Sequence, residues 1–174
     1  MKIPIVTIIG KPNVGKSMFF NRVVGSRLAI TADEAGTTRD RIFFKVIHPE
    51  IDFFLVDTGG LEFEKQDKED LEGNIQKQTR VAIDESDLVL FMVNSKEELS
   101  PDDLKAAELL RKTSNKKSII LVVNKCDKPP MQGELADLYK LGLGTPFPIS
   151  ALHDSGIGTL QKEIIDILKD RHSK

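Results

Sequence analysis

Short apolar runs alternate with amphipathic stretches along most of the chain. A short continuous run of Val, Ile, Leu and Phe between turn residues is typical of a strand that is buried on both faces. The strands predicted in this way are residues 3–9, 42–48, 51–57, 87–94, 118–124 and 146–149. Residues 42–57 are expected to form a hairpin with a tight turn at Pro49-Glu50, which places one antiparallel strand at an edge of the sheet.

Helical patterns separate most of these runs. A helix should begin at Ser100-Pro101, because a capping hydroxyl, a proline in the first turn and two following aspartates all suit a helix N-terminus. The helices expected are residues 16–24, 69–83, the one that begins at Ser100-Pro101, a weak one near 132–140, and 158–170 with its regular apolar stripe. This order predicts an α/β fold with a mostly parallel six-stranded sheet, one antiparallel edge strand and helices on both faces.

Composition limits the possibilities further. The chain has 174 residues, of which 40% are hydrophobic and 30% charged, which suits one domain spanning 1–174. No apolar run is long enough to span a bilayer, and no secretory signal precedes the first strand. The single cysteine excludes an internal disulfide and fits a reducing compartment, so we expect a cytoplasmic protein. The net charge of −2 argues against the whole chain being an electrostatic nucleic-acid binder.

The sequence GKPNVGKS at residues 10–17 follows the first strand and opens a helix, which is the context of a phosphate-binding loop. Gly10 and Gly15 should allow the backbone angles that turn N–H groups toward phosphate oxygens. Lys16 would place its charge on the β- and γ-phosphates, and the Ser17 hydroxyl could ligate Mg²⁺. The loop residues expected to bind nucleotide are Gly10, Lys11, Pro12, Asn13, Val14, Gly15, Lys16 and Ser17. The motif makes the predicted fold that of a P-loop NTPase.

Two polar segments that lack a regular pattern, residues 25–41 and 58–70, are candidates for functional loops. Asp57 ends a strand just before the second segment and could hold Mg²⁺ through water, although it could also be a turn cap. Thr38, or alternatively Thr37, could complete the Mg²⁺ ligands when a γ-phosphate is present. Gly60 could donate its N–H to that phosphate, which would make residues 58–80 a switch segment. The residues of this part of the chain that are expected to contact nucleotide are Asp57, Thr58, Gly59, Gly60 and Leu61.

The sequence NKCD at residues 124–127 ends another buried strand and predicts which base is bound. Asp127 can accept hydrogen bonds from both the N1–H and the N2 amine of guanine, whereas adenine lacks both donors. Asn124 could contact the N7/O6 side and brace the phosphate loop, and Ala151 could donate its backbone N–H to O6. The base-contacting residues expected are Asn124, Lys125, Cys126, Asp127, Ser150, Ala151 and Leu152.

The motifs GKPNVGKS, GTTRD, DTGGL, NKCD and SAL together resemble those of translation-factor-related GTPases of the Era/TrmE type. Within them the chain is similar to the first GTPase domain of the Der (EngA) family, above all over LYKLGLGTPFPISALHDSGIGTL. Such proteins are bacterial ribosome-assembly GTPases with two GTPase domains in tandem followed by a KH-like domain. The resemblance implies that this chain is an N-terminal part of a longer protein, or else a short relative. It also implies contact with a large-subunit assembly intermediate through the longer protein.

Leu61 stands where Ras-like GTPases carry a glutamine that positions water, and a leucine cannot orient water. Similar GTPases with an asparagine at the place of Asn13 are activated by K⁺, so the resemblance implies a K⁺ ion that supplies positive charge beside the phosphates. Alternatively, Asn13 only braces the loop, and Arg39 or Arg41 supplies the charge. The catalytic residues expected are Lys16, Asn13, Thr38 and Gly60.

Three other functions remain open at this point. The chain could be the GTPase domain of a tRNA-modification protein of the TrmE type, although residues 138–152 disfavour it. It could be a nucleotide-dependent binding module that does not turn over. A P-loop kinase is the least favoured, because NKCD indicates guanine and no lid with clustered arginines is present.

Overall fold

We describe the chain from a computed structural model, which covers residues 2–25, 42–57, 71–113, 117–131 and 133–174. The strands are β1 (Ile5–Ile9), β2 (Ile42–Val46), β3 (Phe53–Asp57), β4 (Leu88–Asn94), β5 (Ser118–Asn124) and β6 (Phe147–Pro148). The helices are α1 (Lys16–Val24), α2 (Leu71–Glu85), α3 (Pro101–Thr113), α4 (Ala136–Tyr139) and α5 (Ile157–His172).

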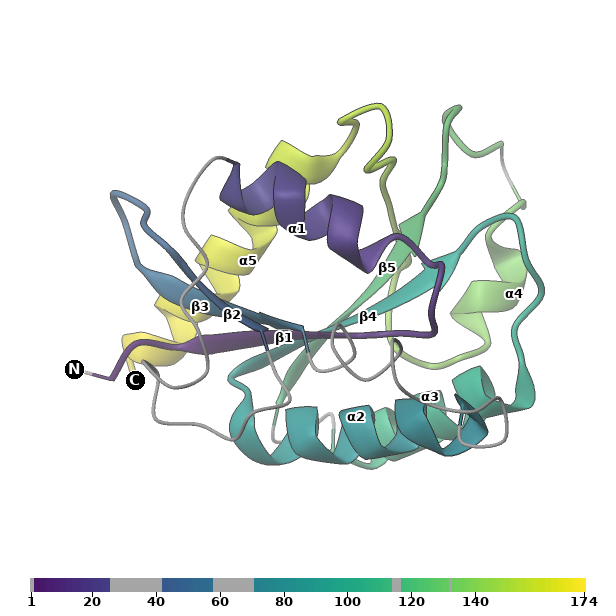
Figure 1. Cartoon of the computed structure of the whole chain (residues 1–174), viewed down its shortest axis with the longest axis horizontal. Helices are drawn as coiled ribbons and strands as arrows, with labels where there is room; N and C mark the ends of the chain where they lie inside the picture. Colours follow the sequence, from purple (N-terminus) through teal and green to yellow (C-terminus); the bar gives the residue numbers. More distant parts are fainter. Residues whose placement is uncertain (1, 26–41, 58–70, 114–116, 132) are drawn as a thin grey trace.

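The six strands form one sheet in the order β2-β3-β1-β4-β5-β6. Only β2 is antiparallel to its neighbour, and it lies at an edge, as predicted. Helices α1 and α5 cover one face of the sheet, and α2 and α3 cover the other (Figure 1). The predicted fold class is therefore confirmed.

Strand β4 shows why the central strands are continuous apolar runs. All of its residues are buried, and they alternate between two cores. Leu88, Leu90 and Met92 pack into the core under α1 and α5. Val89, Phe91 and Val93 pack into the core over α2 and α3. Because both faces of this strand are covered, its positions favour apolar side chains as far as Asn94, the polar residue at its carboxyl end.

The edges of the sheet differ from prediction. The expected tight turn at Pro49-Glu50 is a longer connection, since β2 ends at Val46 and β3 begins at Phe53. Side chains organise this connection, and the His48 N–H donates to Asp52 Oδ1 at 3.0 Å. Strand β6 is only Phe147–Pro148, and the weak helix expected near 132–140 is the short α4.

The start of α3 matches its prediction. The Asp103 N–H donates to Ser100 Oγ at 3.2 Å, and the Ser100 N–H donates to Asp103 Oδ2 at 2.9 Å. This reciprocal pair is a capping box, which satisfies N–H groups that have no partner inside the helix. None of the helices in the described ranges has the length and apolar character needed to cross a bilayer.

The carboxyl ends of the parallel strands meet at one edge of the sheet. Ile8 lies opposite Asp57, and Asn94 lies opposite Asn124. The phosphate loop follows β1 at the same edge, since α1 begins at Lys16. The polar strand ends singled out in the sequence are therefore brought together by strand register, and this edge is where ligands bind in open α/β sheets.

The core on the α2–α3 face can be tested with two leucines of α3. Leu110 is fully buried, whereas Leu104 is half exposed. We expect Leu110→Ala to lower the free energy of unfolding by about 2–5 kcal/mol, because it leaves a cavity in a packed core. The matched control Leu104→Ala should change it by less than about 1 kcal/mol. Urea denaturation measures both, and equal effects at the two positions would contradict the packing described.

Candidate functional site

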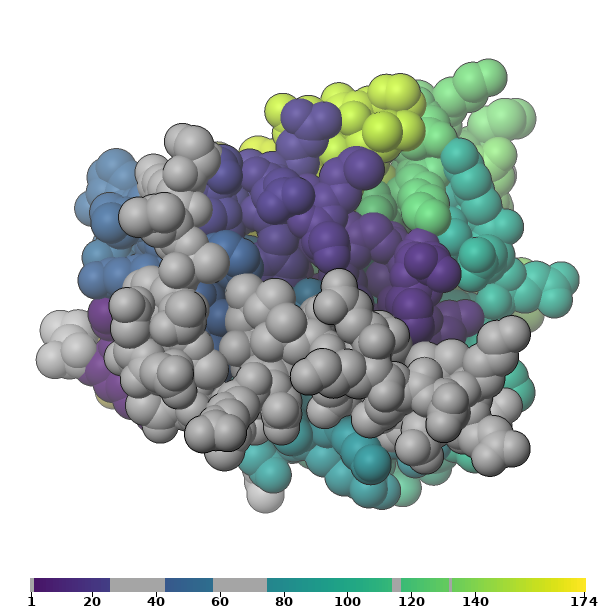
Figure 2. All heavy atoms as spheres, viewed as in Figure 1, coloured from purple at the N-terminus to yellow at the C-terminus, as the bar shows by residue number. Residues whose placement is uncertain are grey.

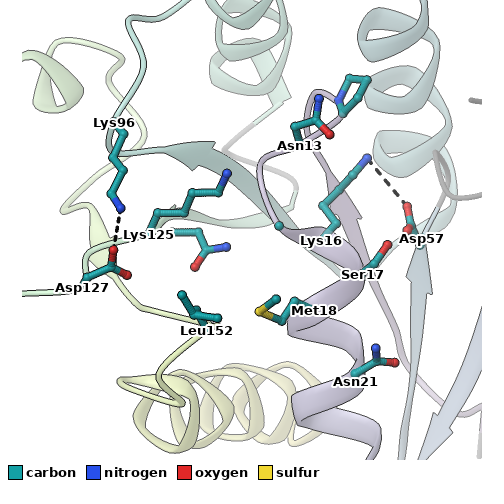
Figure 3. Close-up of a pocket in the computed structure, with 13 residues that line it drawn as sticks. Asn13, Lys16, Ser17, Met18, Asn21, Asp57, Lys96, Lys125, Asp127 and Leu152 are labelled. Carbon is teal, nitrogen blue, oxygen red and sulfur yellow. Dashed lines mark hydrogen bonds and ion pairs between the residues drawn. The ribbon is translucent and has the colours of Figure 1, made fainter.

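A cavity of about 760 Å³ opens at the carboxyl edge of the sheet (Figure 3). This volume lies in the range of small-molecule sites. In the space-filling view, the phosphate loop and α1 (purple) lie between the β2–β3 region (blue) and the segments that follow β4 and β5 (teal and green) (Figure 2). The lining residues are Pro12, Asn13, Gly15, Lys16, Ser17, Met18, Asn21, Asp57, Lys96, Asn124, Lys125, Asp127 and Leu152.

The phosphate loop needs its two glycines for different reasons. Gly15 has φ +99°, and a Cβ there would lie 2.1 Å from Asn124 Nδ2. The prediction that Gly10 supplies an unusual backbone angle is wrong, since its φ is not in the left-handed region. A Cβ at Gly10 would instead lie 2.7 Å from the Met92 carbonyl oxygen, so glycine is needed because β1 and β4 approach closely there. Asn13 has φ +69°, which asparagine tolerates better than most residues.

Lys16 is buried at the first turn of α1. Its Nζ donates to the Gly10 carbonyl oxygen at 2.7 Å and to Gln78 Oε1 at 3.5 Å, and it lies 3.8 Å from Asp57 Oδ1. Burial lowers the pKa of Lys16, and the Asp57 carboxylate opposes that shift. The ammonium group therefore lies in a pocket built from the phosphate loop, β3 and α2, beside the cavity.

Ser17 and Asp57 both line the cavity, one at the start of α1 and the other at the end of β3. A hydroxyl and a carboxylate are oxygen donors that suit a hard cation such as Mg²⁺. The described residues hold no cluster of three His, Cys, Asp or Glu side chains that could bind a metal. A magnesium ion here would therefore need most of its ligands from water and from a bound phosphate, which is the usual arrangement for this ion.

Asn124 connects the two ends of the cavity. Its Nδ2 donates to the Val14 carbonyl oxygen at 2.8 Å, so the predicted brace of the phosphate loop is present. Its Oδ1 accepts from the Ala151 N–H at 3.0 Å. That N–H was expected to face guanine O6, but in this structure it is taken by Asn124, because residue 151 directly follows the strand region beside β5.

Asp127 lies at the far end of the cavity from Lys16, on an exposed turn (Figure 3). Its Oδ1 accepts from Ser150 Oγ at 3.1 Å and lies 3.8 Å from His153 Nε2. Its Oδ2 forms an ion pair with Lys96 Nζ. The hydrogen bonds from Lys96 and then from Ser150 lower the pKa of Asp127, so the carboxylate is ionised and able to accept hydrogen bonds.

Of the other predicted contact residues, some line the cavity and others have contacts elsewhere. Lys125 and Leu152 line the cavity, and Lys125 has φ +65°. Val14 is buried in the core, and Lys11 forms a 3.0 Å ion pair with Asp103 of α3. Burial raises the pKa of the Cys126 thiol, which fits a packing role better than a reactive one.

Several predicted residues lie outside the described ranges. They are Thr37, Thr38, Arg39, Arg41, Thr58, Gly59, Gly60 and Leu61.

Four residues at the site were not predicted from the sequence. Met18 and Asn21 line the cavity from α1, and Lys96 lines it from the turn after β4. Gln78 of α2 is buried against Lys16, and its Nε2 has no hydrogen-bond partner among the described residues. Lys96 could have been found, because it comes two residues after the end of a buried parallel strand. Gln78 carried a weaker signal, a polar residue on the apolar face of a predicted helix.

The sequence of this chain is similar to those of known GTPases. The family model for 50S ribosome-binding GTPases matches residues 5–125. The chain is 44% identical over 170 residues to GTPase Der of Staphylococcus carnosus and 42% identical over 165 residues to GTPase Der of Geobacillus kaustophilus. These matches cover 98% and 95% of this chain but only 38% and 37% of the two relatives, so the chain spans little more than a third of their length.

Solved structures agree with the fold. A variant of Era from Aquifex aeolicus, bound to GDP and AlF₄⁻, matches with a TM-score of 0.68 and 30% identity over 96% of this chain and 57% of that one. The FeoB G-domain of Methanococcus jannaschii matches with a TM-score of 0.61 and 24% identity over 97% of this chain and 99% of that one, which supports the fold alone. With a phosphate loop, a strand-end aspartate and an NKCD turn around one cavity, and with a family model that matches most of its length, the chain belongs to the 50S ribosome-binding GTPase family.

Proposed function

We propose that this chain is a GTP-binding and GTP-hydrolysing switch domain with a slow intrinsic rate. The observation that carries the proposal is the placement of Lys16 and Asp127 at opposite ends of one cavity, with Asn124 bonded to the phosphate loop between them. A nucleotide has its phosphates and its base at opposite ends, so one ligand can reach both. Membership in a GTPase family supports the same function.

At the phosphate end, Lys16 would donate to the β- and γ-phosphates, and backbone N–H groups of the loop and of the α1 N-terminus would donate to the same oxygens. Ser17 and Asp57, together with Thr38 or Thr37, would hold Mg²⁺, which supplies positive charge between the β- and γ-phosphates when it is bound. Gly60 would contact the γ-phosphate. The neighbouring residues Thr58, Gly59 and Leu61 complete the proposed set around it.

At the base end, Asp127 would accept from both donors of guanine. Ser150 already donates to its Oδ1, which fixes the orientation of the carboxylate. The Lys125 stem and the exposed Leu152 side chain would cover the ring. A base without these donors would gain no hydrogen bond from the carboxylate, and that difference is the source of discrimination against adenine.

We propose K⁺ as an activator, held through Asn13. The Asn13 side chain is exposed, lines the cavity and makes no hydrogen bond within the described part of the chain. Its amide oxygen is therefore available to a cation beside the phosphates, where added positive charge stabilises the transition state. The alternative in which Asn13 braces the loop is not supported by any hydrogen bond of its amide among the described residues.

We also propose that the domain is the first GTPase domain of a longer protein and that it acts in large ribosomal subunit assembly in the cytoplasm. The support is the family's description as 50S ribosome-binding GTPases and the small share of the GTPase Der relatives that the chain spans. A second GTPase domain and a KH-like domain would then follow in cis. The match to GTPase Der favours this function over a tRNA-modification role. Turnover of GTP would separate it from a binding module without catalysis.

The base assignment is tested by Asp127→Asn. This variant should bind GDP about a hundredfold more weakly, because two hydrogen bonds to a charged acceptor are lost. It should gain affinity for xanthosine diphosphate, since the new amide can donate to the additional carbonyl. Calorimetry with GDP, xanthosine diphosphate and ADP measures all three affinities. Equal binding of ADP and GDP by the parent chain would refute guanine selection.

The phosphate assignment is tested by Lys16→Ala and Ser17→Ala. Lys16→Ala should weaken GTP binding by at least about tenfold, because a charge-assisted contact to phosphate is removed. Ser17→Ala should weaken binding only when Mg²⁺ is present. The charge-matched control is Lys112→Ala, which removes a lysine paired with Glu108 on the surface of α3. Normal GTP–Mg²⁺ affinity in either test variant would contradict the assignment.

The K⁺ proposal is tested by comparing GTP hydrolysis in KCl and NaCl at equal ionic strength. The parent should turn over faster in KCl, and Asn13→Ala should lose that difference while it still binds GTP. Leu61→Ala should change the rate far less, because leucine cannot orient water. If the parent hydrolyses GTP equally fast in both salts, Arg39, Arg41 or an arginine from a partner becomes the better candidate for the missing charge.

A further inference from the structure

Lys96 lies in the turn that follows β4, and this turn is bonded to the base-recognition segment. The Lys96 N–H donates to Asn94 Oδ1 at 2.9 Å. The Ser95 N–H donates to the Asn124 carbonyl oxygen at 3.0 Å, and Ser95 Oγ donates to the Lys125 carbonyl oxygen at 3.0 Å. These bonds hold the Lys96 backbone beside the residues that would receive the base.

The Lys96 side chain reaches into the same site. Its ammonium group pairs with Asp127 Oδ2, and Figure 3 shows the two side chains pointing toward one another at the end of the cavity. The other oxygen of Asp127 accepts from Ser150 Oγ at 3.1 Å. The two carboxylate oxygens are therefore engaged by donors of different kinds, a hydroxyl on one and an ammonium group on the other.

These two donors differ in how easily they can leave. Ser150 is buried at 1% exposure, and its backbone forms two hydrogen bonds with Ser155. The Lys96 side chain is 61% exposed, and a long exposed lysine side chain changes rotamer at little cost. A carboxylate oxygen can accept two hydrogen bonds, so Ser150 can remain while a base binds at Oδ1. Oδ2 has the same capacity, but Lys96 lines the cavity and Ser150 does not, so the ammonium group takes the acceptor position of Oδ2 on the side of the base.

We propose that Lys96 is a specificity-determining residue of the base site, which pairs with the carboxylate oxygen that would accept from the guanine N2 amine and leaves that oxygen when guanine binds. This inference rests on the proposed binding of guanine nucleotides. A purine that has the N1–H but lacks the N2 amine can bind at Oδ1 without displacing Lys96. Lys96 therefore reduces the advantage that the N2 amine gives to guanine. An exposed ion pair of this kind changes an equilibrium by up to about fivefold.

The test compares GDP with inosine diphosphate, which has the same phosphates and the N1–H but lacks the N2 amine. Lys96→Met keeps the length of the side chain and removes its charge. The preference of this variant for GDP over inosine diphosphate should be about two- to fivefold greater than that of the parent. The ratio of the Kd for inosine diphosphate to the Kd for GDP should rise accordingly, and it cancels any effect of the lost charge on the phosphates. Lys96→Arg should keep the ratio of the parent, because the ion pair can re-form.

Lys112→Met is the matched control, since it removes an exposed lysine paired with Glu108 away from the cavity and should leave the ratio unchanged. Thermal melts establish that each variant is folded. An unchanged or lower ratio in folded Lys96→Met overturns the role of Lys96, while GDP binding by the parent still stands. If the parent binds neither GDP nor inosine diphosphate, the proposed function itself fails.

Discussion

One buried side chain, the amide of Asn124, holds the two halves of the site together. It donates to the Val14 carbonyl oxygen in the phosphate loop and accepts from the Ala151 N–H after β6. A buried amide that lost either partner would be left unsatisfied, so the three segments are expected to keep their positions together. The same contact explains Gly15, since any Cβ there would lie within 2.1 Å of the Asn124 amide nitrogen.

Lysines and aspartates are paired at both ends of the cavity. Lys16 and Asp57 form a buried pair at the phosphate end, and Lys96 and Asp127 form an exposed pair at the base end. The two environments give the pairs different properties. Burial lowers the pKa of Lys16 and fixes its position among several acceptors, whereas the exposed pair is screened by solvent and can open. The proposed phosphate end is thus pre-organised, and the proposed base end can exchange partners.

The central part of the fold could be predicted from the sequence because its signals are local. Strands β1, β4 and β5 are apolar runs that lie between two layers of helices, and α3 begins at a capping box formed by Ser100 and Asp103. The edges were less predictable. The connection from β2 to β3 is shaped by a hydrogen bond that the Asp52 carboxylate accepts from the His48 N–H, and β6 is reduced to Phe147–Pro148. Such contacts depend on which groups meet in space.

The sequence by itself determined which residues are candidates for the site, because GKPNVGKS, DTGG and NKCD each place a polar residue at the end of a predicted strand or the start of a helix. Parallel strands bring those ends to one edge, so the cavity followed from the strand order. Only the tertiary structure decided which neighbours each group has. Gly10 is needed because the Met92 carbonyl oxygen lies close, and Gln78 reaches Lys16 from α2. Lys96 meets Asp127 across 31 residues, and a contact between two turns so far apart leaves no periodic signal in the sequence.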